Sequence, residues 1–352
     1  MIKQLPMLPL LEQFIKETKN GRRRKLNGDR HSFKSAQNYE YVLKHLKGYQ
    51  EYTKSTIRLT TNIRNNQRLI LLEKQYWKKF YIGFTDYLLY EKGYYDNFVG
   101  SIFKVLKCFF RYLKSDKFLL IPECYERFYV RKEDIRVISL LPEQYCLLIL
   151  DKTFEGKLTS SLKRCKDIFV FGCTAALRYS DLKSLKVKNI EKRCGQHYLI
   201  INTLKTDTSI QVKLPAFAID IYERYAKRKK PEEKLFPTIA STNFNKRLKA
   251  LGQKAGWTEI IGKHRTRNGI REEIMSTCNV HFRFCDQLSA HLMRKTGITV
   301  LLMMGMPEHL VRKISGHSPQ SKEFFRYVNF AQSYVTDELD KAHQKLLALY
   351  QG

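Results

Sequence analysis

Acidic side chains, paired cysteines and long apolar runs are all scarce in this chain of 352 residues. Asp and Glu number 34 against 64 Lys and Arg, and the eight cysteines include no Cys-x-x-Cys pair. No apolar run reaches membrane-spanning length, and the first residues are too soon charged for a signal peptide. Cysteines scattered in apolar runs are typical of a reducing compartment. We therefore expect a cytoplasmic protein without a membrane segment.

One group of potential metal ligands lies close together in the sequence, namely Cys278, His281 and Cys285. These residue types can bind zinc, but their spacing matches no common zinc pattern. No acidic cluster suited to two metal ions stands out elsewhere. We expect no bound metal.

The excess of basic residues points to a polyanionic partner. The formal net charge is +30, and neutralising phosphates releases counterions, which favours binding to nucleic acid. A ribosomal or merely basic soluble protein would carry the same charge, so charge alone does not decide. A hydrophobic content of 43% with 12% aromatics indicates a folded chain, and its length allows two domains.

A short C-terminal stretch places two His, one Arg and one Tyr on or beside predicted helices. His291 and Arg294 are three residues apart, so on a helix they share a face and can converge on one oxyanion. A second predicted helix ends at Gly316, directly before His317, and Tyr327 follows ten residues later. This combination is typical of a site that cuts phosphodiesters.

The order His-x-x-Arg, Gly-His and Tyr resembles that of the tyrosine recombinases, the phage integrase family. The resemblance implies an arginine and a lysine upstream, and both positions are filled. Arg178 lies in the run Ala-Leu-Arg-Tyr-Ser-Asp-Leu, and Lys205 lies between two strand-like runs. Asp181 matches the family's acidic position and is expected to hold Arg178 in place. The likeness covers roughly residues 140–327 with all the motifs in order.

What the resemblance implies is a site-specific recombinase of a bacterial mobile element. Arg178 and Arg294 would grip the phosphate oxygens, while His291 or His317 would add donors or act as base. Tyr327 would attack, Lys205 would protonate the leaving oxygen, and a 3′-phosphotyrosine would form without a cofactor. The family acts as a homo-tetramer on two double-stranded DNA sites through a Holliday junction, and a free monomer is expected. Integration, excision and inversion remain equally open.

The expected fold is mainly α with a small β-sheet. Helical stripes over residues 1–125 predict a small helical domain, and residues 126–137 are the expected linker. The resemblance implies that the first domain is a core-binding (SAM-like) DNA clamp. It also implies that residues 138–352 form a mixed α/β catalytic domain with a C-terminal tail helix. That tail helix packs either on its own domain or on a neighbouring protomer. Two basic runs are either phosphate contacts or solvated loops; their members are Arg22, Arg23, Arg24, Lys25, Lys263, Arg265 and Arg267.

Several alternatives stay open at this point. Arg178 could be a structural partner of Asp181, and Lys205 an exposed turn lysine. Tyr327 is one residue further from His317 than the family pattern, so Tyr334 is a second candidate nucleophile. An inactive DNA-binding regulator on the same fold and a type IB topoisomerase-like enzyme are the rival functions.

Overall fold

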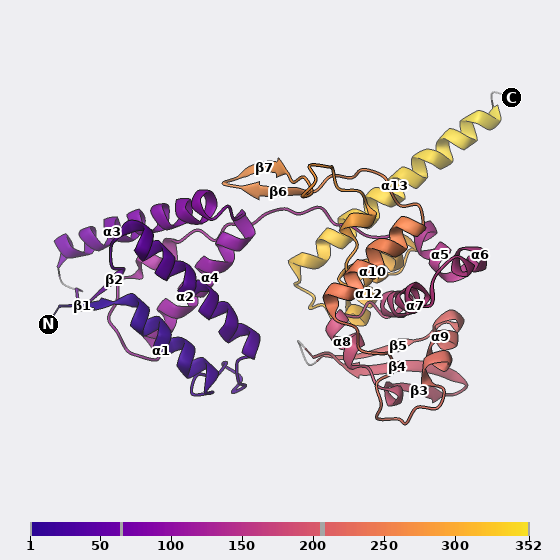
Figure 1. Cartoon of the computed structure of the whole chain (residues 1–352), viewed down its shortest axis with the longest axis horizontal. Coiled ribbons are helices and arrows are strands. Elements are labelled where there is room, and N and C mark those ends of the chain that lie inside the picture. The colour runs from indigo at the N-terminus through magenta and orange to yellow at the C-terminus, as the bar shows by residue number, and fades with distance from the viewer. Residues whose placement is uncertain (1, 64–65, 205–207, 351–352) are drawn as a thin grey trace. The chain divides into compact units, whose positions relative to one another are not determined.

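The computed structural model describes residues 2–63, 66–204 and 208–350, and it divides into two compact units (Figure 1). Unit 1 comprises Met1–Ile135 and His264–Glu273, and unit 2 comprises Arg136–Lys263 and Ile274–Gly352. Both units are mostly helical with small sheets, which confirms the predicted fold class. No helix within the described ranges is both long and apolar enough to cross a bilayer.

Unit 1 is built on four long helices around an aromatic core. The helices are α1 (Met7–Lys19), α2 (Phe33–Thr53), α3 (Gln67–Asp86) and α4 (Asp96–Ser115). A π-helical turn, η1 (Tyr87–Glu91), follows α3 directly. Trp77, Phe84 and Phe109 are buried, as the helical spacing of the aromatics predicts. A short strand, β2 (Arg58–Thr61), pairs antiparallel with β1 (Lys3–Pro6).

The segment predicted as a linker packs against unit 1. The 3₁₀ helix η2 (Glu123–Arg127) places Tyr125 flat against Phe110, with ring centroids 4.9 Å apart. Phe128 and Glu133 are also buried. The boundary between the compact units therefore falls between Ile135 and Arg136.

A β-hairpin from the C-terminal part of the sequence also belongs to unit 1. Its strands are β6 (His264–Arg267) and β7 (Ile270–Glu273), and its tip is Asn268-Gly269, both with positive φ. Asn-Gly with positive φ at both residues suits the tight turn that matches strand twist. The sequence-based division placed this hairpin in the catalytic domain.

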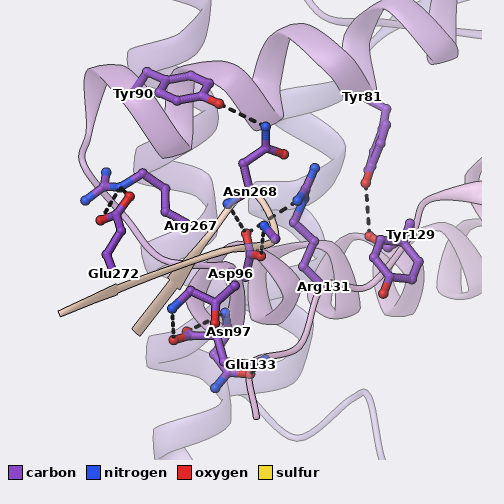
Figure 2. A network of polar contacts seen from close by, with 12 residues as sticks. Tyr81, Tyr90, Asp96, Asn97, Tyr129, Arg131, Glu133, Arg267, Asn268 and Glu272 are labelled. Atoms are coloured by element: carbon purple, nitrogen blue, oxygen red, sulfur yellow. Dashed lines mark hydrogen bonds and ion pairs between the residues drawn. The ribbon is translucent and has the colours of Figure 1, made fainter. Parts of the chain in front are cut away.

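Asp96 and Glu133 hold the hairpin in place (Figure 2). Asp96 accepts hydrogen bonds from the backbone N–H of Asn268 at 3.0 Å and of Gly269 at 2.9 Å. Glu133 accepts two from the Arg265 guanidinium, at 2.7 and 2.9 Å. Tyr95 is the N-cap of α4, so the Asp96 carboxylate does not cap its helix and binds the hairpin tip instead.

Unit 2 surrounds α7 (Ser160–Thr174), whose residues 165–173 are all buried. The other helices are α5 (Pro142–Leu150), α6 (Lys152–Gly156), α8 (Tyr179–Ser184), α9 (Ala216–Ala226), α10 (Ser241–Lys254), α11 (Leu292–Met303), α12 (Glu308–Ser315) and α13 (Lys322–Tyr350), with 3₁₀ turns η3 (Val187–Asn189) and η4 (Cys285–Gln287). One antiparallel sheet has the order β3 (Ile190–Arg193), β4 (Gln196–Asn202), β5 (Ser209–Lys213). The tail predicted as a separate helix continues α13 without a break (Figure 1).

Helix α11 packs closely on the end of α7, and this packing brings the candidate site residues of both segments together. A Cβ on Gly297 would lie 2.1 Å from the carbonyl oxygen of Cys173 and 3.0 Å from the Cα of Ala176. Only glycine allows this approach, since real Cβ atoms do not come so near. As a result, the N-terminal turn of α11, which carries Arg294, lies beside the chain that leads to Arg178.

Candidate active site

Arg178 follows a strained corner at the end of α7. Ala176 has a φ of 47°, in the left-handed region that non-glycine residues seldom occupy. Arg178 is the N-cap of α8, and its Nη1 lies 4.0 Å from Oδ2 of buried Asp181. Within the part of the chain that the structure describes, neither of these two atoms has a hydrogen-bond partner. Arg178 therefore keeps an unsatisfied donor in a partly buried position.

Arg294 is buried in the first turn of α11, with 3% of its surface exposed. Its Nη1 donates to the carbonyl oxygen of Ala176 at 3.1 Å, which ties it to the corner that leads to Arg178. Burial and then the charge of Arg178 lower the pKa of Arg294 to about 10. The two guanidinium charges are thus close enough to repel each other, an arrangement that an anion would stabilise.

His317 joins these arginines because α12 ends at Gly316. Gly316 has a φ of 62°, and the His317 N–H donates to the Arg312 carbonyl oxygen at 3.0 Å, a Schellman-type end. The Arg294 Nη2 lies 3.2 Å from Nδ1 of His317 and 3.3 Å from Nε2. Burial, Arg294, Arg178 and Arg312 lower the pKa of His317 to about 3, so the ring is neutral at ordinary pH.

Tyr327 comes to the same place from α13. It is 8% exposed, and its ring centroid lies 6.0 Å from that of His317 and 6.2 Å from that of Phe324. Burial raises the pKa of Tyr327, and the charges of Arg294, Arg326 and Arg178 oppose that rise. The phenol is therefore protonated in the free protein and lies in a field that favours its ionised form.

The second candidate phenol is held elsewhere. The hydroxyl of Tyr334 donates to Oε1 of Glu143 on α5 at 2.7 Å, and this bond raises the pKa of Tyr334 to about 12. Both effects count against Tyr334 as a nucleophile.

His291 and Lys205 are the other two predicted catalytic residues. His291 is the N-cap of α11 with an exposed side chain, one turn before buried Arg294. Lys205 lies outside the described residues. Leu204, which precedes it, donates its N–H to Oδ1 of Asp181 at 3.1 Å.

The basic runs divide into partly buried and exposed side chains. Arg23 packs its guanidinium 4.4 Å from the ring centroid of Phe14. Arg265 pairs with Glu133, and Arg267 Nη1 donates to the Leu89 carbonyl oxygen at 2.7 Å, so both stabilise unit 1 instead of forming a solvated run. The remaining members of the two runs are exposed: Arg22, Arg24, Lys25 and Lys263.

The candidate zinc ligands lie in different surroundings. Cys278 is exposed, whereas Cys285 is buried, and burial raises the pKa of the Cys285 thiol. Within the described ranges, no group of three or more His, Cys, Asp or Glu side chains could hold a metal ion.

Two residues beside the site carried no signal in the sequence. Arg312 lies over the ring of Phe324, with its guanidinium carbon 4.0 Å from the centroid, and its charge acts on His317. Ser315 contacts the His317 ring through its hydroxyl. The Arg312 contact arises from the packing of α12 on α13, and the Ser315 contact arises from the way the chain turns at Gly316.

Comparison with known proteins assigns the family. The phage integrase family model matches residues 152–333, which is more than half of the chain. The chain belongs to this family, and the predicted class of enzyme, a tyrosine recombinase, is confirmed. No sequence among the curated proteins matches it.

Solved structures similar in fold cover almost the whole chain. XerH site-specific recombinase bound to palindromic difH substrate has 16% identity over 94% of this chain and 84% of its own, with a TM-score of 0.54. A lambda integrase tetramer bound to a Holliday junction has 12% identity, coverage of 92% and 78%, and a TM-score of 0.58. The Tn1549 transposon integrase in complex with transposon right end DNA has 15% identity, coverage of 98% and 100%, and a TM-score of 0.56.

Proposed function

We propose that this protein cuts and rejoins DNA at specific sites through a covalent 3′-phosphotyrosine. The observation that carries the proposal is the convergence of Arg178, Arg294, His317 and Tyr327 from four separate elements of unit 2. Buried cations next to a phenol are what a phosphodiester under attack requires, because negative charge develops on its non-bridging oxygens.

In the proposed reaction each side chain has one task. Arg178 and Arg294 hold the non-bridging oxygens, and Asp181 keeps Arg178 in position. His291 donates to the phosphate, Tyr327 forms the bond to phosphorus, and Lys205 protonates the departing 5′-oxygen. The covalent bond keeps the energy of the broken one, so rejoining needs no cofactor.

Tyr327 is the proposed nucleophile. Its ring lies against His317, whereas Tyr334 is bound to Glu143. Both lie on the single helix α13, so Tyr334 could reach the arginines only if the helix broke or moved. The extra residue between His317 and Tyr327 lies in the loop before α13, and loops absorb such changes without rotating a helix.

The proposed substrate is double-stranded DNA and the proposed assembly is a tetramer. The net charge of +30 favours phosphate binding, and exposed Arg22, Arg24, Lys25 and Lys263 are proposed contacts. The lambda integrase named above forms a tetramer bound to a Holliday junction, which supports the same assembly here. Strand exchange between two sites then gives integration, excision or inversion.

Trapping the covalent complex on a nicked suicide substrate tests the proposal. The substrate is drawn from the DNA that flanks the gene, and the DNA-linked peptide is mapped by mass spectrometry. Tyr327→Phe should bind DNA and form no adduct, while the matched variant Tyr334→Phe on the same helix should still form one. An adduct on Tyr334 would overturn the assignment. DNA binding without any wild-type adduct would instead favour an inactive regulator.

A further inference from the structure

Ser315 lies at the end of α12, two residues before His317, and its side chain is fully buried. It has no part in the reaction as proposed above. Its hydroxyl oxygen lies 2.8 Å from Nδ1 of His317 and 2.7 Å from the carbonyl oxygen of Val311. These two contacts determine where the proton of the imidazole lies.

A serine hydroxyl has one proton to donate, and a carbonyl oxygen can only accept. If the hydroxyl donated to Nδ1, two oxygens would face each other at 2.7 Å with no hydrogen between them. If it donates to Val311, its lone pairs are left to accept a hydrogen bond from Nδ1–H. The second arrangement satisfies every group, so the proton of His317 lies on Nδ1 and Nε2 carries a lone pair.

Arg294 does not compete for either ring nitrogen. Its Nη2 is almost equidistant from them, at 3.2 and 3.3 Å. An atom in the ring plane at those distances would collide with the ring carbons, so the guanidinium lies over the ring face. Guanidinium groups commonly stack on rings in this way. Nδ1 therefore keeps Ser315 as its in-plane partner.

The charges around His317 keep it to a single proton. Burial lowers the pKa of the ring most, and the charges of Arg294 from α11, Arg178 from the start of α8 and Arg312 from α12 itself lower it further, to about 3. The Tyr327 phenol lies alongside from α13. A neutral imidazole has one N–H, so its position decides whether Nε2 donates or accepts.

We propose that Ser315 is a positioning residue that holds His317 in the Nδ1–H tautomer, so that Nε2 accepts the proton of the attacking tyrosine. The inference rests on the proposed function. As the Tyr327 oxygen bonds to phosphorus and the bond to the 5′-oxygen breaks, the phenol proton moves to Nε2. The incoming phosphate supplies the negative charge that makes an imidazolium tolerable among three arginines. On rejoining, the same proton returns to the tyrosine oxygen as it leaves phosphorus.

Nitrogen NMR of the full-length protein labelled with ¹⁵N-histidine tests the tautomer without DNA. The His317 signals are assigned as those lost in His317→Gln. The wild type should show a protonated Nδ1, Ser315→Thr should keep it because the hydroxyl remains, and Ser315→Ala should shift the population towards protonated Nε2. A wild-type ring protonated at Nε2, or a tautomer unchanged in Ser315→Ala, would overturn the proposal.

Single-turnover cleavage then tests the consequence. We expect Ser315→Ala to lose on the order of tenfold to a hundredfold in rate, a fraction of what general-base catalysis supplies. Its rate should rise with pH between 6.5 and 9, since the phenol then ionises without the base, while the wild type and Ser315→Thr stay flat. A shifted tautomer with an unchanged rate and pH profile would remove the base role from His317. If the wild type forms no adduct, the proposed function fails, and the NMR result still decides the role of Ser315.

Discussion

Two clusters of buried charge in this protein are built in opposite ways. In unit 1 the Glu133 carboxylate accepts hydrogen bonds from Arg265, from the Thr266 N–H at 2.9 Å and from the Asn97 N–H at 2.8 Å. In unit 2 the charge of Arg178 acts against that of Arg294, and the Asp181 carboxylate lies 4.0 Å from Arg178. The first cluster is closed, because its donors and its carboxylate bind one another. The second is open, because Asp181 does not fully neutralise the two arginines.

This difference separates a structural use of charge from a functional one. A closed network satisfies its donors and acceptors, so it contributes stability and fixes the hairpin. An open cluster of like charges costs stability, and an anion that enters can relieve the repulsion. A buried cation without a matching acceptor is therefore the better sign of a binding site than a buried ion pair.

Removing a cation from the open cluster should have the largest effect. Arg178→Met keeps the length of the side chain and loses the donors, so DNA cleavage should fall by about a hundredfold or more. Stability should stay within about 1 kcal/mol, because a repulsive charge is lost as well. Single-turnover cleavage and calorimetry measure the two effects. Arg224→Met, which removes a guanidinium bound to Asp167 at 2.8 Å, is the control and should keep cleavage.

Breaking the closed cluster in unit 1 should instead lower the stability of the protein. Glu133→Gln leaves Arg265 without its counter-charge and should destabilise unit 1 by about 2 kcal/mol. Calorimetry of the full chain should show a melting point about 4–8 °C lower. Glu272→Gln on the same hairpin removes a more exposed partner of Arg267 and should cost less than about 0.5 kcal/mol. Equal effects of the two variants would contradict the comparison.

Acid should weaken the closed cluster in a defined range. Burial alone would raise the pKa of Glu133, but hydrogen bonds from Arg265, Thr266 and Asn97 outweigh it and hold the pKa below its usual value. The stability that Glu133 contributes is therefore present above its unfolded pKa of about 4.3 and lost as pH falls through its folded pKa. Urea titrations from pH 6 to pH 3 should show wild type and Glu133→Gln converging below about pH 4. A constant difference would contradict this account.

Relieving the backbone strain beside the open cluster should have the smallest effect. Ala176→Gly relieves a left-handed backbone conformation and should stabilise unit 2 by about 1 kcal/mol, a rise of about 2 °C in its melting point. Cleavage should change by less than about twofold, because the Ala176 carbonyl oxygen still accepts from Arg294. A destabilised variant would mean that the corner is not strained.

Local patterns in the sequence determined much of this protein. Helical stripes predicted α1 to α4, Gly316 predicted the end of α12, and motif order predicted the family before any fold was known. Such features depend on residues near each other in the chain, where spacing sets which side chains share a face. The resemblance to the family's motif order selected the candidate site as a set: Arg178, Lys205, His291, Arg294, His317 and Tyr327.

Only the tertiary structure decided which partners the polar side chains contact. Asp96 reads as a helix cap, yet it binds a hairpin tip more than 170 residues away in sequence. Arg265 reads as a phosphate contact, yet it pairs with Glu133, and Arg312 acts beside the site because α12 packs it over Phe324 of α13. The partner of a polar side chain depends on distance and on burial. Both are set by the packing of segments that are far apart in the sequence.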